Sequence, residues 1–251
     1  MVICVANQKG GVGKTTTAVN LAVCLARGSG GVLAIDCDPQ ATMTRQLGIE
    51  VRGLGVNLVD VLAGRAAAAE AVVTDAVDGV DVIPAARALS GLEMTLVGEL
   101  GRERFLDEAL QPLKDCYGTV VIDTPPNLGL LTVNALICAD TVIAPVSCED
   151  EASVQGLVEL RGTLSKLSRL RAGEPELITV LTRWAPARIM SQVIDASLAE
   201  LGMPAVAKVP GRAVVGQAGA EHVPLAVAAP DGCVALAYEH LADRLRVVIS
   251  R

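Results

Sequence analysis

The residues best suited to chemistry lie near the start of the chain, in the octet Lys-Gly-Gly-Val-Gly-Lys-Thr-Thr at positions 9–16. Its glycines let the backbone curl so that several N–H groups point at one place, which is how such loops bind phosphate oxygens. Lys14 is placed to reach the β- and γ-phosphates of a nucleotide, and the Thr15 hydroxyl is placed to bind Mg²⁺. We therefore expect a phosphate-binding loop made of Lys9, Gly10, Gly11, Val12, Gly13, Lys14, Thr15 and Thr16.

Both flanks of the octet have the pattern that such a loop requires. The apolar run 2–6 predicts a strand, and the amphipathic run 18–26 predicts a helix. The N-terminus of that helix would add partial positive charge beside bound phosphates. A merely flexible glycine loop would not explain Gly-Lys-Thr at the junction of a strand and a helix.

The octet departs from the usual phosphate-loop pattern, G-x-x-x-x-G-K-[ST], at its first position. Gln8 stands where that pattern has glycine, and a second lysine, Lys9, follows it. The sequence K-G-G-x-G-K-[ST] resembles the deviant Walker motif of the ParA/MinD ATPases. In that family the early lysine reaches the nucleotide of a partner subunit. The resemblance implies an ATP-sandwich dimer and catalytic roles for Lys9, in trans, and Lys14, whereas the alternative for Lys9 is a solvated surface lysine.

Three aspartates follow predicted strands, where α/β sheets collect their ligands. Asp123 comes directly after Val-Val-Ile, as a Walker B aspartate does, and we expect it to hold Mg²⁺ through water. D-C-D-P-Q at 36–40 and D-T-P-P-x-L-G at 123–129 resemble the two switch segments of the same family.

The resemblance implies that Asp38 orients or activates an attacking water, as a catalytic residue, and that Asp36 lies close to the metal. The implied metal set is Thr15, Asp36 and Asp123. The alternative for both Asp36 and Asp38 is that they cap the helix that follows.

The resemblance is looser in the last third of the chain. Pro210 and Arg212 fall where the family has a proline-anchored loop touching adenine and ribose, which implies nucleotide contacts for both. The usual family motif continues with arginine and serine, whereas this chain has Ala-Val-Val-Gly at 213–216, so no DNA contact is transferred residue by residue. His222 and His240 have no partner residue in sight and are predicted to be structural.

Strand and helix patterns alternate along the chain. We predict strands at 32–35, 80–83, 119–122, 141–145, 177–181 and 206–209, and helices at 57–75, 89–100, 104–113, 128–137, 151–170, 188–201 and 232–248. Apolar strands of this kind predict an α/β fold whose mostly parallel, twisted sheet carries helices on both faces. With the resemblance this is the P-loop NTPase fold. No linker or repeat divides residues 1–251, so we expect a single P-loop ATPase domain.

Composition narrows the classes of protein. The sequence is 51% hydrophobic and 20% charged, which argues against disorder, and its 2% aromatic content nearly excludes base stacking on aromatic platforms. No apolar run is long enough to span a membrane and no basic leader precedes the first strand, which predicts a cytoplasmic protein without a stable membrane anchor. Seven cysteines without C-x-x-C spacing predict buried free thiols.

The net charge is −7, yet one stretch of the chain is basic. Between residues 161 and 188 only Glu174 and Glu176 oppose the basic residues, which are Arg161, Lys166, Arg169, Arg171, Arg183 and Arg188. If these gather on one face, an acidic chain can still bind DNA. The alternative is an ordinary solvated helix surface.

Taken together, the resemblance implies a ParA-like ATPase switch with ATP and Mg²⁺ as cofactors. We expect a homodimer with ATP that binds DNA without sequence preference and is nucleoid-associated in that state. Slow hydrolysis, stimulated by a ParB-like partner, would release it and serve chromosome or plasmid partition. The alternatives are a MinD-like switch on membranes, a cargo-positioning ATPase, a metabolic phosphoryl-transfer or ligase enzyme, and an ATP-binding module that does not hydrolyse.

Overall fold

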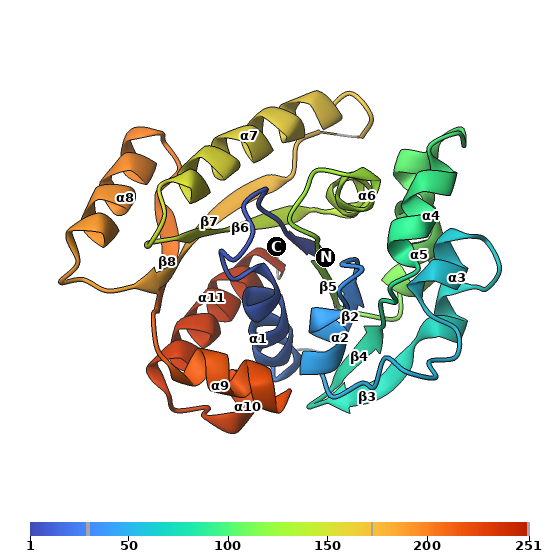
Figure 1. Cartoon of the computed structure of the whole chain (residues 1–251), viewed down its shortest axis with the longest axis horizontal. Helices are drawn as coiled ribbons and strands as arrows, with labels where there is room; N and C mark the ends of the chain where they lie inside the picture. Colours follow the sequence, from blue (N-terminus) through green and yellow to red (C-terminus); the bar gives the residue numbers. More distant parts are fainter. Residues whose placement is uncertain (29–30, 172, 250–251) are drawn as a thin grey trace.

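The structure is a computed structural model that describes residues 1–28, 31–171 and 173–249 (Figure 1). Its centre is an eight-stranded sheet with the order β3-β4-β2-β5-β1-β6-β7-β8. Every neighbouring pair is parallel except β3 and β4. The strands are β1 (Val2–Val5), β2 (Val32–Asp36), β3 (Val73–Val77), β4 (Val80–Ile83), β5 (Thr119–Asp123), β6 (Thr141–Ser147), β7 (Glu176–Trp184) and β8 (Ala205–Pro210).

Helices cover both faces of this sheet. Figure 1 shows α1, α9, α10 and α11 on one face and α6, α7 and α8 on the other, with α3, α4 and α5 beside the β2–β4 end. The helices are α1 (Lys14–Ala26), α2 (Thr42–Gln46), α3 (Leu58–Leu62), α4 (Leu89–Leu96), α5 (Phe105–Lys114), α6 (Leu130–Cys138), α7 (Ala152–Leu167), α8 (Ile189–Glu200), α9 (Val214–Glu221), α10 (Leu225–Ala228) and α11 (Cys233–Ile249). The predicted α/β fold is confirmed.

Each central strand sends alternate side chains into two separate cores. Cys4 of β1 packs with the helices α3 and α5–α8, whereas Ile3 and Val5 pack with α1 and α11. Because successive side chains of a strand point to opposite faces, a strand buried on both must be apolar throughout. This is why the strands were readable as continuous apolar runs.

The prediction of one helix over residues 57–75 is wrong. The segment forms α3, a 3₁₀ turn at Ala68–Ala71, and then strand β3, which lies antiparallel to β4. The helix begins well, because the side chains of Asn57 and Asp60 form a reciprocal capping box. It ends at Leu62, and Gly64 just beyond has the positive φ, 68°, that commonly terminates helices. The β-branched residues at 72–73 then favour a strand.

Other boundaries differ less. α1 begins four residues before the predicted helix, at Lys14, and α4 and α7 end before the predicted ends. The short helices α2, α9 and α10 were not predicted. Five cysteines are buried free thiols as expected, but Cys116 and Cys233 are exposed.

The sheet brings three functional segments to one edge. In register, Val5 at the end of β1 and Asp36 at the end of β2 both lie opposite Asp123 at the end of β5. The loop after β1 and both aspartates therefore meet at the carboxyl ends of adjacent strands.

In the described part of the chain, no helix is both long and apolar enough to cross a bilayer.

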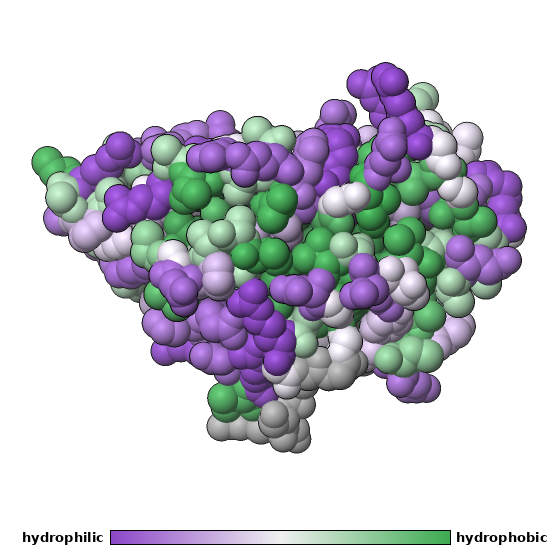
Figure 2. Space-filling model, turned by 90° about the horizontal axis from the view of Figure 1, so that it is seen from below, coloured by the Kyte–Doolittle hydropathy of each residue, from purple (hydrophilic) through white to green (hydrophobic). Residues whose placement is uncertain are grey.

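On the face seen from below, apolar residues form a band across the middle with polar residues around it (Figure 2).

Candidate functional site

The loop between β1 and α1 is held by hydrogen bonds to neighbouring elements. Gly13 precedes the first helical residue with φ of 92°, a left-handed conformation that side chains disfavour. Val12 is buried, and its carbonyl accepts a hydrogen bond from the Thr182 hydroxyl of β7 at 2.8 Å. Thr17 of α1 shares a hydrogen bond with the Tyr238 hydroxyl of α11 at 3.2 Å. The loop is thus held from both sides with its N–H groups at the helix N-terminus.

Lys14 is buried inside its own loop. Its ammonium donates to the Lys9 carbonyl at 3.2 Å, and only 7% of the residue is exposed. Burial lowers the pKa of Lys14, while Asp123 and Asp38 are close enough to act in the opposite direction. A partly desolvated cation at a helix N-terminus suits a phosphate.

Asp36 is fully buried and its oxygens are engaged within the protein. One oxygen accepts from the Asp38 N–H at 3.0 Å, and the other accepts from the N–H and hydroxyl of Thr44 at 2.8 and 2.7 Å. Burial raises the pKa of Asp36 to about 6, although the Thr44 hydrogen bonds oppose this. Thr44 lies in the first turn of α2. Asp36 therefore caps the N-terminus of the helix that follows, which is the alternative to a direct role at the metal.

Asp38 lies half buried just past the end of β2. Its carboxylate accepts from the Gln40 N–H at 2.8 Å, and its carbonyl accepts from the Ala41 N–H at 2.8 Å. Ala41 has a φ of 52°, so this tight turn is held in an uncommon conformation. The turn keeps the Asp38 carboxylate at the same edge of the sheet as the loop.

Asp123 is the buried group best suited to a cation. Neither carboxylate oxygen finds a hydrogen-bond partner among the residues that the structure describes. Burial raises the pKa of Asp123 well above its usual value, Asp36 adds to this, and the Thr15 hydroxyl and Lys14 act against it. An unsatisfied carboxylate beside a threonine hydroxyl fits Mg²⁺, which prefers oxygen ligands and keeps several waters. Within the described ranges no cluster of three His, Cys, Asp or Glu is arranged to hold a metal.

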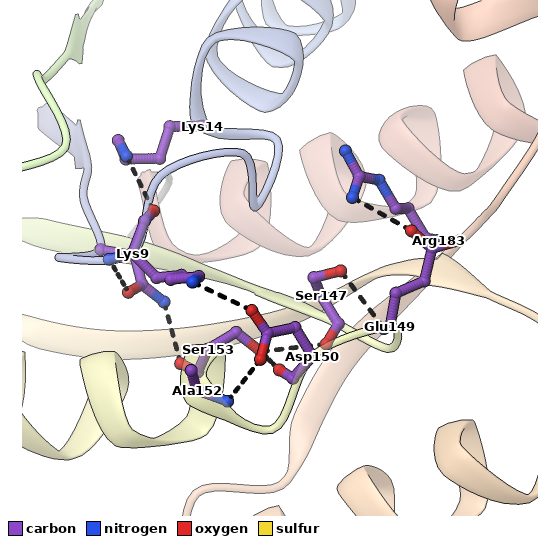
Figure 3. A network of polar contacts seen from close by, with 9 residues as sticks. Lys9, Lys14, Ser147, Glu149, Asp150, Ala152, Ser153 and Arg183 are labelled. Carbon is purple, nitrogen blue, oxygen red and sulfur yellow. Dashed lines mark hydrogen bonds and ion pairs between the residues drawn. The ribbon is translucent and has the colours of Figure 1, made fainter.

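Lys9 points the other way from Lys14. Its ammonium makes an ion pair with Asp150, at the start of α7, with 3.1 Å between nitrogen and oxygen (Figure 3). The Asp150 carboxylate also accepts from the Ala152 N–H at 2.9 Å, and this bond and Lys9 lower its pKa. The Lys9 side chain is 43% exposed. Nothing in the sequence pattern indicated that Asp150 would meet Lys9.

A cavity of about 460 Å³ adjoins the loop on the side of β7 and β8. It is lined by Gly13 and Thr16 from the loop and, among others, by Pro210 and Arg212. The two predicted residues from the far end of the chain therefore do meet the phosphate loop. Such a volume suits a small ligand such as a nucleoside.

Sequence reasoning missed several residues of this cavity. Thr182, Glu149 and Tyr238 line it, and Glu149 pairs with both Arg183 and Arg188 at 3.1 Å. These residues come from separate elements and share no motif. The sequence signal that could have indicated Thr182 and Glu149 is their position at the ends of the apolar runs that form β6 and β7, because ligands bind at the carboxyl ends of parallel strands.

A family model described as an AAA domain matches residues 1–174. The sporulation initiation inhibitor protein Soj of Bacillus subtilis is 45% identical over 163 residues, which are 65% of this chain and 64% of Soj. The chromosome partitioning protein ParA of Caulobacter vibrioides is 44% identical over 168 residues, 66% of this chain and 62% of ParA. The matches thus span less than two thirds of either relative. The chain belongs to the ParA/MinD-like family of partition ATPases.

A solved structure resembles this ParA/MinD-like chain over nearly its whole length. It is named cobyrinic acid a,c-diamide synthase from Mycobacterium smegmatis and contains an ATP analogue and magnesium. It is 32% identical with a TM-score of 0.85, and the match covers 97% of this chain and 93% of that one. The similarity therefore includes the last third, where the motifs are hard to read.

The basic residues of 161–188 have different surroundings in this family member. Arg183 and Arg188 lie at the cavity with Glu149. Arg161 donates to the Leu201 carbonyl at 3.3 Å, and Arg171 donates to the Leu136 carbonyl at 3.0 Å. Lys166, in the last turn of α7, and Arg169, two residues after its end, are exposed and make no ion pair with any residue that the structure describes.

Proposed function

We propose that this chain is an ATP-dependent switch that dimerises around nucleotide, with Lys9 of each subunit reaching the phosphates held by the other. The observation that carries the proposal is the contrast between the two lysines of one loop. Lys14 is buried and directed inward, so it serves its own subunit. Lys9 lies at the outer edge, about half exposed, in a solvent-accessible ion pair that is readily exchanged.

Within each subunit we assign the phosphates to the loop N–H groups and Lys14, and Mg²⁺ to the Thr15 hydroxyl and Asp123. The ion would neutralise charge on the β- and γ-phosphate oxygens. Asp36 supports this set indirectly, because its oxygens already hold Asp38 and Thr44. Pro210 and Arg212 would contact the adenosine in the adjoining cavity.

Asp38 is the proposed catalytic residue. It accepts only one hydrogen bond on its carboxylate, from Gln40, among the contacts of the described residues, and so it retains capacity to orient a water. The cavity arginines Arg183 and Arg188 are paired with Glu149 on the nucleoside side. Turnover by the chain alone would therefore be slow, and a ParB-like partner would accelerate it.

We infer that the ATP-bound dimer binds DNA without sequence preference and that hydrolysis releases it, for chromosome or plasmid partition. The Caulobacter relative is a chromosome partitioning protein, which supports this role. In the monomer Lys166, in the last turn of α7, and Arg169, just after that helix, are exposed, and dimerisation would double their number on one particle. Binding should then weaken steeply with salt, because phosphate contacts release counterions.

The test is retention of a duplex DNA oligonucleotide over a salt series, with and without ATP and Mg²⁺. We expect ATP-dependent retention in the wild-type protein and its loss in the double variant Lys166→Glu/Arg169→Glu. Retention that is equal with and without ATP would contradict the switch. Retention that is unchanged in the double variant would assign this pair to solvent.

A ligase is the competing function, since the Mycobacterium smegmatis structure carries the name of a diamide synthase. A ligase spends ATP on a carboxylate substrate and an amide donor, whereas a switch hydrolyses ATP without either. The test is phosphate release by the purified chain with ATP and Mg²⁺ alone. Release under these conditions favours the switch, and its absence favours the ligase.

The MinD-like alternative depends on a free amphipathic helix at the end of the chain. In α11 the apolar residues Leu241, Ala242 and Leu245 are buried in the core against α1. A helix whose apolar face is already covered does not offer it to lipid. We expect no ATP-dependent pelleting with anionic liposomes, and clear pelleting would favour the membrane switch.

A further inference from the structure

A second cavity, of about 710 Å³, adjoins the Asp38 turn. Pro39 and Gln40 of that turn form part of its wall. The rest comes from α2, the loop 48–52, the loop after β4 and the end of α9. The motifs and the proposed nucleotide site use none of these surrounding residues.

This cavity is basic in an acidic protein. Arg45, Arg52 and Arg87 line it, with Glu50 as the acidic residue and His222 beside them. None of the three arginines makes an ion pair with any residue that the structure describes, whereas Arg65 and Arg183 elsewhere pair at 2.9 and 3.1 Å. The chain as a whole carries −7. Three unpaired guanidinium groups around one concavity suit carboxylates or phosphates, which they bind in a bidentate fork.

Buried hydrogen bonds connect this cavity to the acidic turn. The Ala85 N–H, two residues before Arg87, donates to the Thr44 hydroxyl at 3.0 Å. Thr44, next to Arg45, donates in turn to Asp36, which accepts from the Asp38 N–H. Two cavity walls and the Asp38 turn are therefore fixed to the same buried carboxylate. A ligand that moves or stiffens these walls acts on Asp38 through contacts of 2.7 to 3.0 Å.

We propose that this cavity is a binding site for an acidic peptide segment of a partner protein, and that its occupancy alters ATP turnover at Asp38. Recognition of acidic motifs by arginine clusters is an established binding mode. A concave site of this volume takes a few side chains, whereas a duplex presents a convex backbone that needs a broad surface. The effect on turnover rests on the proposed switch, but peptide binding does not.

The test uses the full chain and a fluorescein-labelled polyglutamate peptide, followed by anisotropy at low and high salt. Arg52→Glu/Arg87→Glu should weaken binding at least ~10-fold, since charged hydrogen bonds to two arginines are lost. The control Lys166→Glu/Arg169→Glu makes the same change in charge on α7 and should leave binding within ~2-fold. Arg52→Gln/Arg87→Gln repeats the test without charge reversal should the first variant fold poorly. Melting curves report whether each variant is folded.

Three results would overturn the site. One is the absence of saturable, salt-sensitive binding to the wild-type chain, and another is equal loss in both Glu variants. The third is loss of duplex DNA, with the peptide retained, in Arg52→Glu/Arg87→Glu, which would make the cavity a nucleic-acid surface. If the peptide binds at the cavity but the chain hydrolyses no ATP, the switch fails while the site stands. If turnover occurs and the bound peptide leaves it unchanged, the coupling to Asp38 is wrong.

Discussion

The two lysines of the phosphate loop, five positions apart, have opposite surroundings. Lys14 begins α1, is 7% exposed and donates to the Lys9 carbonyl. Lys9 stands before the glycines, and its side chain reaches Asp150, two residues before α7, where both partners are over two fifths exposed (Figure 3). The Lys14 end of the loop is buried within its own subunit, whereas the Lys9 end is exposed at the surface.

The two lysines differ in the free energy needed to displace each ammonium from its present surroundings. A buried ammonium has lost part of its hydration and is stabilised by a nearby anion, so the Lys14 end is pre-organised for phosphate. An exposed ion pair contributes about 0–1 kcal/mol and is screened by salt, so Lys9 can exchange Asp150 for another anion at little cost. A loop built in this way can act within its own subunit and on a neighbour at once.

The largest expected effect is at the buried end. Lys14→Ala should weaken ATP binding about 100-fold, because charge-assisted hydrogen bonds to phosphate contribute roughly 1.5–3 kcal/mol each. Isothermal titration calorimetry with ATP and Mg²⁺ measures this. Lys9→Ala is the matched control and should bind ATP within ~3-fold of wild type as a monomer. Equal losses in both variants would remove the distinction between the two ends.

Asp38→Ala should lower ATP hydrolysis about 100-fold, the usual contribution of a positioned base, while ATP binding stays intact. The turn still has the Ala41 N–H bond to the Asp38 carbonyl, so the fold should hold. Phosphate release under saturating ATP is the measurement. Wild-type turnover in this variant would exclude Asp38 from the mechanism.

Thr44→Val tests the buried acid that holds the turn. It removes a donor to Asp36 and leaves the Ala85 N–H without its acceptor, so it should lower the free energy of unfolding by about 1–3 kcal/mol. Urea denaturation measures the change. Thr163→Val on the exposed side of α7, where the hydroxyl only bonds the Glu159 carbonyl, is the control and should change little. Similar small losses of unfolding free energy in both variants would mean that the Thr44 hydrogen bonds do not stabilise the fold more than an exposed one does.

Asp150→Asn should have the smallest effect. The informative result is whether ATP-dependent dimerisation becomes stronger or weaker. Releasing Lys9 from its ion pair should strengthen ATP-dependent dimerisation, by at most ~5-fold for each subunit. Dimer dissociation constants from sedimentation give the answer, with Glu159→Gln on α7 as a charge-matched control. Weaker dimers in Asp150→Asn would mean that Asp150 positions Lys9 for the partner and does not compete with it.

The motifs predicted where most residues of the proposed phosphate site lie in the fold. Its chemistry depends on backbone conformation, so Gly13 and Lys14 had to be adjacent in sequence, and Asp123 had to follow an apolar strand. The fold is confirmed because continuous apolar strands alternate with helices, and the family is confirmed by the similarity to known proteins. The roles of Lys9, Asp38, Asp123, Pro210 and Arg212 stay predictions, as does the single domain.

What could not be predicted depends on side chains that meet only in three dimensions. The Lys9–Asp150 pair, the Glu149 arginines and the basic cavity each join segments far apart in the chain. The error at residues 57–75 has another cause. Alanine has high helix propensity, but the alanine-rich residues form only a 3₁₀ turn, and the β-branched residues after them pair with β4 as strand β3.

The central claim is that Lys9 completes a neighbour's site, and sedimentation velocity tests it most directly. The comparison is between Asp38→Ala, which should accumulate bound ATP, and Asp38→Ala/Lys9→Ala, both with saturating ATP and Mg²⁺. We predict a dimer for the first and a monomer for the second, although calorimetry should show that both bind ATP. Dimers of equal stability in the two proteins would contradict the account.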